Sequence, residues 1–488
     1  MQKLSLSLDN IEEFIPSHFS PHERELTKTL FYKNLSLRAH QYYKGKMQTL
    51  PKAPVYGFNW FNVWYTPGVS RISTHIRDDN SSSFELSNRG NLVAVVSDSS
   101  RVLGDGNCTP PGGLGVMEGK AFLMKYLAGI DAVSLCIDSR NASGVNDPDK
   151  IIDFVKMLQP SFGAVNLEDI SQPNCYKVLD VLKEECDIPV WHDDAQGTAC
   201  VTLAGLLNAL NLTNKKLEDA KIVYLGAGAS NTTIARIINL AGADPSKMIM
   251  FDSKGALHKN RKDIEADPAF YRKWEICTTT NINQTQSIEE AIKGADVLLS
   301  LAAPGPDVVK PAWIHSMAEN PIVFVCANPV PEIYPHAAKE AGAYIVATGR
   351  GDFPNQVNNS IGFPGILKGA LLTKAKKITD NMAIAAAQSI AAFSERRGIH
   401  ADNIIANMEE MEVFPHVAAD VAMQAIKDGV ARQAVTWEEV YDLTLGGIVQ
   451  TRKLTSILQN EGFIEEPPGE MLRESLDMAI RMAGKQAK

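Results

Sequence analysis

The sequence predicts an α/β protein in which an N-terminal domain precedes a doubly wound parallel-sheet domain that ends in helices. Three observations lead to this prediction. From Gly197 onward, short apolar runs alternate with helical segments, which is typical of a parallel sheet covered by helices. A glycine-rich turn at residues 226–228 follows one of these runs. After about residue 370 the pattern is helical to the end.

The domain limits follow from where this alternation begins. We expect the N-terminal domain over residues 1–195, with a polar, helix-prone lead over 1–55, and the second domain over 196–488. Apolar runs bounded by polar residues are the expected strands. They cover 91–96, 133–137, 164–167, 188–191, 222–225, 248–251, 297–300, 323–327 and 344–347, with helices at 117–127 and 148–158.

Composition narrows the class of protein. The chain has 488 residues and a formal net charge of −9, which argues against a nucleic-acid surface because phosphate binding needs a basic footprint. No apolar stretch reaches the ~18–20 residues of a membrane span, and the N-terminus lacks a signal-peptide pattern. The seven cysteines are scattered without a CxxC pair. We therefore expect a cytoplasmic enzyme with reduced cysteines.

Two acidic pairs each follow an apolar run. Glu168-Asp169 comes after the first run and Asp193-Asp194 after the second. Two strands that end in carboxylates can place three or four oxygens around one point, and Mg²⁺ and Mn²⁺ take oxygen ligands of this kind. The alternative is that the acids cap the following helices, where Asp and Glu also favour the N-terminus. Spacing alone leaves both interpretations open.

The glycine turn has the context of a dinucleotide-binding motif. A strand precedes it, a helix follows it, and the next strand closes on Asp252. Gly226 permits the tight turn, Gly228 lets a pyrophosphate approach the backbone, and the helix N-terminus supplies donors. The third glycine of the motif is replaced by Asn231. The expected cofactor-binding residues of the turn are Gly226, Ala227, Gly228, Ala229 and Ser230.

The choice between NAD⁺ and NADP⁺ depends on the residues around Asp252. An acid at this place bonds a ribose hydroxyl and favours NAD⁺. Ser253 and Lys254 follow at once and offer a hydroxyl and an ammonium to a 2′-phosphate. We expect NADP⁺, with NAD⁺ as the alternative. For the basic residues at 259–262, an ordinary solvated loop explains the sequence as well as phosphate binding does.

Three further features lie upstream. Tyr65 precedes a Pro-Gly turn, Arg101 begins the glycine-broken loop Arg101-Val-Leu-Gly104, and Lys120 follows Gly119 at the expected start of an apolar helix. A helix N-terminus lowers the proton affinity of an ammonium, so a lysine there and near a metal can act as a base. Taken singly, such residues more often pack or face solvent.

The ordered set of motifs resembles that of the malic enzymes, of the compact type common in bacteria. The resemblance runs from about residue 40 to residue 432, and the terminal segments match it poorly. It implies a malic-enzyme-type N-terminal domain joined to a Rossmann-like domain. The motifs are Tyr65-Thr-Pro-Gly-Val, Arg101-Val-Leu-Gly, Gly119-Lys120, Glu168-Asp169, Asp193-Asp194-x-Gln-Gly-Thr198, Gly226-Ala-Gly228, Ala327-Asn328-Pro329, Ala347-Thr-Gly-Arg350 and Asn358-Asn359-Ser360-x-x-Phe-Pro-Gly365.

The resemblance also implies residue roles in oxidative decarboxylation of L-malate. Lys120 would be the general base, helped by Asp193, and Tyr65 the acid that protonates the enol. Arg101 would hold a malate carboxylate by charge-assisted hydrogen bonds. The remaining implied residues are the Mg²⁺ or Mn²⁺ ligands Glu168, Asp169 and Asp194, and the substrate- and cofactor-orienting amides Asn328, Asn358 and Asn359.

Other functions share parts of this pattern. A malolactic enzyme uses the same scaffold and releases lactate, and the motifs barely separate the two. A non-decarboxylating dehydrogenase needs no divalent metal, so the acidic pairs argue against it. A non-catalytic dinucleotide sensor would not need every catalytic side chain. The expected partners are L-malate and a second subunit in a homodimer, with no nucleic acid and no membrane.

Overall fold

The computed structural model describes residues 6–103 and 105–486, so Gly104 of the Arg101 motif lies outside the described residues. Contacts divide the chain into two units: Met1–Leu50 together with Arg452–Lys488, and Pro51–Thr451. This pairing of the segments 1–50 and 452–488 leaves no local pattern in the sequence. Among the described residues, no helix is long and apolar enough to cross a membrane.

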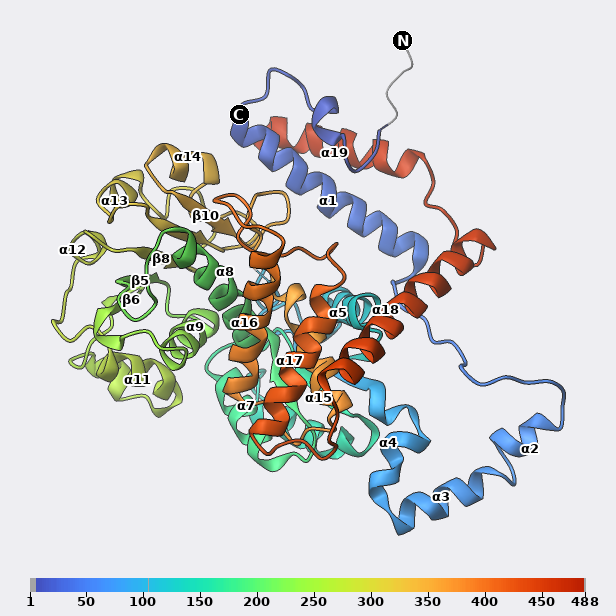
Figure 1. Cartoon of the computed structure of the whole chain (residues 1–488). Helices are drawn as coiled ribbons and strands as arrows, with labels where there is room; N and C mark the ends of the chain where they lie inside the picture. Colours follow the sequence, from blue (N-terminus) through green and yellow to red (C-terminus); the bar gives the residue numbers. More distant parts are fainter. Residues whose placement is uncertain (1–5, 104, 487–488) are drawn as a thin grey trace. The chain divides into compact units, whose positions relative to one another are not determined.

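The first unit is built on two long helices (Figure 1). Helix α1 (Pro21–Tyr43) begins at a capping box in which the Ser20 side chain accepts from the Glu23 amide and the Glu23 side chain accepts from the Ser20 amide. Helix α19 (Glu470–Gln486) packs against α1. Their shared core consists of Ile11, Ile15, Phe31, Leu476 and Ala479.

Within the second unit, a four-stranded parallel sheet carries the first half of the site. Its strand order is β2-β1-β3-β4, with β1 at Leu92–Ser97, β2 at Asp131–Cys136, β3 at Ala164–Leu167 and β4 at Val190–His192. The central strands are apolar and buried, as expected of strands covered on both faces. The connecting helices are α5 (Leu114–Ala128), α6 (Pro148–Leu158) and α7 (Asn174–Glu185).

A six-stranded sheet follows, with the order β10-β9-β8-β5-β6-β7. The chain leaves β5 toward β6 on one side and returns to β8 on the other, which makes the end of β5 the topological switch point where such sheets bind ligands. Every neighbouring pair is parallel except β6–β7. The strands are β5 (Ile222–Leu225), β6 (Met248–Asp252), β7 (Gly255–Ala256), β8 (Val297–Ser300), β9 (Ile322–Val325) and β10 (Ile345–Thr348).

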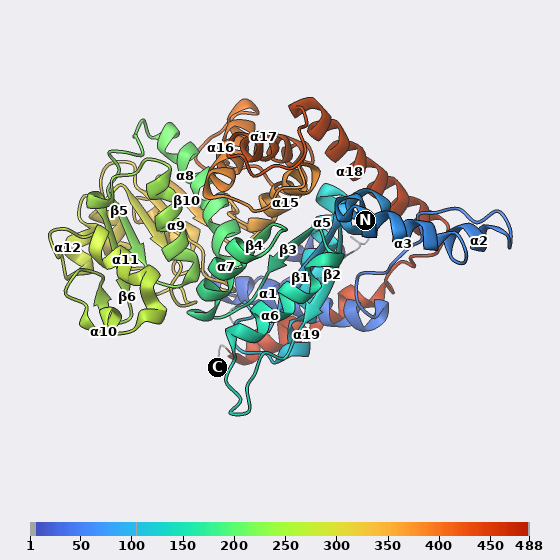
Figure 2. The same cartoon turned by 90° about the horizontal axis from the view of Figure 1, so that it is seen from below.

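Helices surround this sheet and continue beyond it (Figure 2). The apolar helix α8 (Thr198–Leu212) joins the two sheets and packs on α16 (Asp380–Arg396) and α9 (Ala229–Leu240). Helices α15 (Phe363–Leu372), α17 (Val413–Lys427) and α18 (Trp437–Asn460) complete the C-terminal part. The short helices are α2 (Trp60–Trp64), α3 (Val69–Asp78), α4 (Ser83–Leu86), α10 (Lys262–Glu265), α11 (Tyr271–Thr279), α12 (Ile288–Ile292), α13 (Pro311–His315) and α14 (Pro335–Glu340).

The predicted α/β class is confirmed, and each predicted strand corresponds to an observed one with shifts at the ends. One expectation about a helix is wrong. Helix α5 begins at Leu114, so Lys120 lies within the helix and not at its start. The N-terminal dipole, which fades after the first turn, therefore does not govern this lysine.

Close helix packing provides a test of the fold. A Cβ at Gly369 of α15 would lie 2.4 Å from the Ala418 carbonyl oxygen of α17, whereas a Cβ at Gly446 of α18 meets no atom within 4 Å. We expect Gly369→Ala to lower the free energy of unfolding by about 1–3 kcal/mol through overpacking. Gly446→Ala should raise it by about 0.5–1 kcal/mol through helix propensity. Urea denaturation measures both, and equal effects would contradict the packing described here.

Candidate active site

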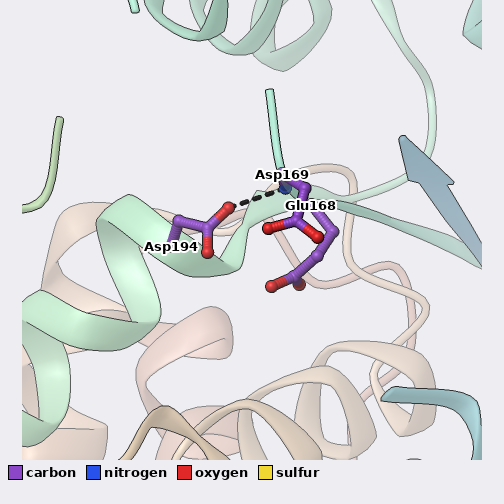
Figure 3. Close-up of side chains that lie close together, drawn as sticks. All are labelled: Glu168, Asp169 and Asp194. Carbon is purple, nitrogen blue, oxygen red and sulfur yellow. Dashed lines mark hydrogen bonds between the residues drawn. The ribbon is translucent and has the colours of Figure 1, made fainter. Parts of the chain in front are cut away.

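Three carboxylates from two neighbouring strands meet at one point (Figure 3). Glu168 and Asp169 follow β3, Asp194 follows β4, and the two strands pair in parallel with Leu167 opposite His192. One oxygen of each carboxylate lies within 4.8 Å of the others. The parallel register thus brings the two acidic pairs together, as the sequence predicts.

Backbone and side-chain hydrogen bonds fix this cluster. The Asn166 amide donates to Glu168 Oε2 at 3.0 Å, and the backbone amide of Asp169 donates to Asp194 Oδ2 at 2.8 Å. Asp169 has φ of 54°, a left-handed conformation that is uncommon outside glycine. The alternative, that the acidic residues cap the helices that follow them, is not observed. The turn that begins at Asp193 has no side-chain cap, and the residue before the next helix, α7, is Pro173.

The electrostatics of the cluster fit a hard divalent cation. Burial and the neighbouring Asp194 raise the pKa of Asp169 to about 7, and burial raises the pKa of Glu168 against the opposing effect of Lys120. Asp169 Oδ2 is buried without a hydrogen-bond partner. Buried acceptors without donors cost free energy, which a cation bound between them would recover. The residues present therefore suit Mg²⁺ or Mn²⁺.

Lys120 points into the same cluster from α5. Its Nζ forms an ion pair with Asp193, lies 3.1 Å from Glu168 Oε1, and sits 4.8 Å from the centre of the Phe363 ring. Burial disfavours the ammonium, but Asp193, Glu168 and Asp194 outweigh it and raise the pKa of Lys120. The expectation of a lowered proton affinity is wrong, because carboxylates surround this ammonium.

Asp193 is held by residues that the sequence analysis did not single out. The indole of the fully buried Trp191 donates to Asp193 Oδ1 at 3.1 Å, and Asp193–Gly197 form a short π-helical turn. A Cβ at Gly197 would lie 1.9 Å from Asp193 Oδ1. The close approach explains why a glycine follows Gln196 in this motif.

The glycine turn after β5 has the geometry that a dinucleotide requires. Gly226 has φ of +95°, and a Cβ there would lie 2.4 Å from the Leu301 carbonyl oxygen. A Cβ at Gly228 would meet no atom within 4 Å, so its backbone is open to a ligand. Ala227 and Ala229 complete the entry into α9, and Ser230 Oγ donates to the Asp194 carbonyl oxygen at 2.9 Å.

Asn231 explains the missing third glycine. Its side chain is fully buried, and Nδ2 donates to the carbonyl oxygens of Leu225 at 3.0 Å and Gly226 at 2.8 Å. The amide therefore ties the start of α9 to the end of β5. A glycine would give close packing at this place, and Asn231 supplies hydrogen bonds instead.

At the end of β6, Asp252 already has a cationic partner. Arg261 donates to both oxygens of Asp252, at 3.0 and 2.9 Å, and also to Asp263. Lys254 is exposed and lies 3.2 Å from Asp263, and Ser253 is exposed as well. Arg261 departs from the interpretation of residues 259–262 as a solvated loop, because its partner Asp252 lies nine residues earlier, across a turn.

One cleft of about 460 Å³ joins Lys120 and the carboxylates to Ser230 at the start of α9, whereas Gly226, Gly228 and Asp252 are not among its lining residues. Asp193 lies fully buried beneath it, in contact with Lys120. Tyr65 is apart from it, because its side chain is 71% exposed at the end of α2 and does not line the cleft. The predicted residues that do line it are Arg101, Lys120, Glu168, Asp194, Ser230, Asn328, Asn358 and Asn359.

A buried acid beneath the cofactor side of the cleft was missed by the sequence analysis. Glu332 is fully buried and accepts from Ser300 Oγ at 2.9 Å and from the amides of Ala302 and Ala327 at 2.8 and 3.0 Å. It thereby ties the loop after β8 to the loop after β9, which carries Asn328. Its signal in the sequence is weak, since an acid in a Pro-rich loop usually faces solvent.

The Asn231 tie gives a testable prediction. Asn231→Ala leaves the Gly226 carbonyl oxygen without its donor, whereas the Leu225 carbonyl oxygen keeps the Leu301 amide. We expect a loss of about 1–3 kcal/mol in the free energy of unfolding and weaker dinucleotide binding. Asn239→Ala, at an exposed position of the same helix, should change stability by less than about 0.5 kcal/mol. Denaturant unfolding and calorimetric titration with NADP⁺ measure both effects. Equal effects of the two substitutions would remove the role given to Asn231.

Comparisons with known proteins agree on one family. The family model described as malic enzyme, N-terminal domain, matches residues 44–183, and the one described as malic enzyme, NAD binding domain, matches residues 195–426. The chain is 41% identical to the bifunctional malic/malolactic enzyme of Bacillus subtilis, over 86% of this chain and 98% of that protein. It is 42% identical to the NAD-dependent malic enzyme of Geobacillus stearothermophilus, over 80% of this chain and 78% of that protein.

A solved structure gives the same result. The crystal structure of Entamoeba histolytica malic enzyme superposes with a TM-score of 0.96 and 64% identity, covering 99% of this chain and 100% of that one. The matches span both sheets and the cleft residues described above. The chain therefore belongs to the malic enzyme family and carries that family's NAD-binding domain.

Proposed function

We propose that this protein catalyses the divalent-metal-dependent oxidative decarboxylation of L-malate to pyruvate and CO₂, with NAD(P)⁺ as hydride acceptor. One observation carries the proposal: a single cleft brings together Lys120, the carboxylates of Glu168 and Asp194, and the amides of Asn328 and Asn359. These groups would supply a base, a cation site and neutral donors to one substrate. The base and the cation site belong to the β1–β4 half, and the two amides follow β9 and β10 of the second sheet.

Lys120 is the proposed general base for the substrate hydroxyl. A cation held by Glu168, Asp169 and Asp194 would polarise the substrate oxygens as a Lewis acid and weaken the negative field that keeps Lys120 protonated. Lys120 would take the proton of the substrate hydroxyl, and a bound nicotinamide would supply the hydride acceptor. Asp193, already ion-paired with Lys120, stabilises the ammonium that forms.

The remaining roles concern the substrate's ends and the enol. Arg101 lines the cleft and is the proposed partner of a malate carboxylate. Asn328 and Asn359 orient substrate and nicotinamide through neutral hydrogen bonds, and Asn358 binds the cofactor. Tyr65 is the proposed acid for the enol carbon, which requires it to reach the cleft from its exposed position. The same steps after oxidation would decarboxylate added oxaloacetate.

A malolactic reaction is the second candidate, because one relative is named for both activities. It would keep the reduced cofactor bound and return the hydride to pyruvate, giving lactate. The two outcomes separate in one assay with L-malate, Mn²⁺ and either cofactor. Net growth of NAD(P)H absorbance with pyruvate supports the malic reaction, and lactate without net reduction supports the alternative.

The metal assignment predicts dependence on a cation. Activity should vanish in EDTA and return with Mn²⁺ or Mg²⁺, and Asp194→Asn should lower the rate more than about a hundredfold, since losing even an outer partner of a ligand costs about 10–100-fold. The exposed Asp187 gives the matched control, Asp187→Asn, with the wild-type rate. Calorimetry with Mn²⁺ should show binding to wild type and control but not to Asp194→Asn. Full activity in the chelator would disprove the metal site.

The Asp252–Arg261 pair predicts cofactor choice. Because Arg261 neutralises Asp252, a 2′-phosphate beside it is not repelled, and we expect NADP⁺ to be preferred over NAD⁺. Arg261→Ala should raise the KM for NADP⁺ about ten- to a hundredfold, the worth of one or two charged contacts, with a smaller change for NAD⁺. Lys254→Ala should act in the same direction more weakly.

Lys262→Ala is the matched control for this cofactor test, since Lys262 is exposed and pairs only with Glu265 among the contacts described. Steady-state kinetics with both cofactors measure the three variants. The contrary result has two parts: the wild type prefers NAD⁺, and all variants have equal KM values for NADP⁺. That result would show that Asp252 sets the preference and that Arg261 only supports the β6–β7 turn.

A further inference from the structure

Arg350 ends a sequence motif that the proposed function leaves without a role. It follows β10 in Ala347-Thr-Gly-Arg350, and its side chain is only 11% exposed. The cleft is lined by its neighbour Gly349 and not by Arg350 itself. A nearly buried guanidinium that stands beside a site without lining it acts on that site through other residues.

The guanidinium binds two partners at the same time. Its Nε donates to Asp352 Oδ1 at 2.8 Å and its Nη2 donates to the other oxygen, a bidentate pair that fixes the plane of the group. The remaining terminal nitrogen, Nη1, donates to the Pro329 carbonyl oxygen at 2.9 Å. Arg350 therefore reaches from the loop after β10 to the loop after β9, at the residue that follows Asn328.

The loop after β9 depends on donors from other elements. Two of the four residues at 328–331 are Pro329 and Pro331, which have no backbone N–H. The segment is therefore held at its carbonyl oxygens. Arg350 donates to that of Pro329, and the Gly305 amide donates to that of Val330 at 3.3 Å. Without Arg350, the residue next to Asn328 has neither a donor of its own nor this partner.

The same loop is attached on the other side by Glu332, which ties it to the end of β8 through backbone amides. Because β9 lies between β8 and β10 in the sheet, Glu332 and Arg350 fasten its loop to both neighbouring strand ends. Ring contacts join the two attachments. The Arg350 guanidinium carbon lies 5.1 Å from the centre of the Phe353 ring, and Phe353 packs edge-on against Tyr334.

These attachments fix an amide that lines the cleft. A Cβ at Gly349 would lie 2.9 Å from Asn328 Nδ2 and 3.1 Å from the Cys326 carbonyl oxygen. The backbone that precedes Arg350 thus lies against the Asn328 amide, while the Arg350 side chain holds the next residue, Pro329. A group that must present one neutral hydrogen bond to a reacting ligand needs such support from its surroundings.

We propose that Arg350 is a positioning residue for the reaction and holds the Asn328 amide in its place at the cleft. The inference rests on the proposed function, because that function gives Asn328 the task of orienting substrate and nicotinamide. Arg350 takes part in no bond-making step, and its effect reaches the cleft through Pro329 and Gly349. Misplacing an orienting group by about 1 Å can cost about a hundredfold in rate.

Substitution of Arg350 tests the proposal. Arg350→Ala removes the donor to Pro329, and we expect the kcat for pyruvate formation from L-malate to fall about ten- to a hundredfold. Mn²⁺ affinity, measured by calorimetry, should stay at the wild-type value, because the proposed ligands belong to the other sheet. Arg350→Lys keeps one cationic donor without the fork that binds Pro329 and Asp352 together, and it should recover part of the rate.

Arg140→Ala is the matched control. Arg140 forms the same bidentate pair with an acid two residues away, Asp138, but both side chains are largely exposed and lie far from the loop after β9 in the sheet order. This variant should keep the wild-type kcat. An Arg350→Ala enzyme that also keeps the wild-type kcat would overturn the proposal.

A double-mutant cycle with Asn328→Ala separates positioning from a general effect on the fold. If Arg350 acts through Asn328, then Arg350→Ala costs less than about twofold in a chain that already lacks the amide. Equal losses in both backgrounds would show that Arg350 supports the fold alone, and would overturn the proposal. An Asn328→Ala enzyme with the wild-type kcat would instead remove the orienting role from the proposed function, and the inference with it.

A second variant keeps the test open if Arg350→Ala does not fold. Gly349→Ala places a methyl group against Asn328 Nδ2, the movable end of a side chain. We expect a lower kcat in the wild-type background and no further loss in the Asn328→Ala background. Gly446→Ala, whose methyl group meets no atom within 4 Å, should keep the wild-type kcat. Equal losses from Gly349→Ala with and without the Asn328 amide would contradict the positioning of that amide.

Discussion

Four carboxylates crowd around one ammonium, and much of the second unit is arranged to tolerate this. Glu168, Asp169, Asp193 and Asp194 stand at the ends of two adjacent parallel strands, where the sheet geometry forces them together. Lys120 offsets part of their repulsion, and burial makes the remaining negative charge expensive. The site therefore carries negative charge that Lys120 does not fully compensate. This excess negative charge is the physical basis of affinity for a divalent cation.

The cation site and the cofactor site share structural supports. Ser230, in the helix that follows the glycine turn, donates to the Asp194 carbonyl oxygen, and Gly197 lies against both Asp193 and Asn359. A shift of the dinucleotide turn would thus move the backbone of Asp194, a proposed metal ligand. On the far side, Glu332 joins the two loops that flank the cofactor half of the cleft. The positions of malate and of the nicotinamide are therefore coupled through these shared contacts.

The sequence predicted the strands because they leave local patterns, and part of the predicted site set, such as Lys120, Glu168 and Asp194, lines the cleft. Buried parallel strands are unbroken apolar runs, and their carboxyl ends coincide with the acidic pairs and the glycine turn. What it could not predict depends on distant contacts. The raised pKa of Lys120 comes from acids on other elements, the Asp252–Arg261 pair crosses a turn, and Glu332 looks like a loop acid until its three donors are seen.

The pairing of α1 with α19 has a consequence for biosynthesis. Helix α1 ends at Tyr43 and α19 begins at Glu470, so nearly the whole chain separates two partners that share one small core. At ribosomal speeds of about 5–20 residues per second, α1 waits roughly 20–90 s for its partner. During that time Phe31 lacks the cover that Leu476 and Ala479 give it in the folded protein. The unit that holds α1 can therefore be completed only after α19 has been synthesised.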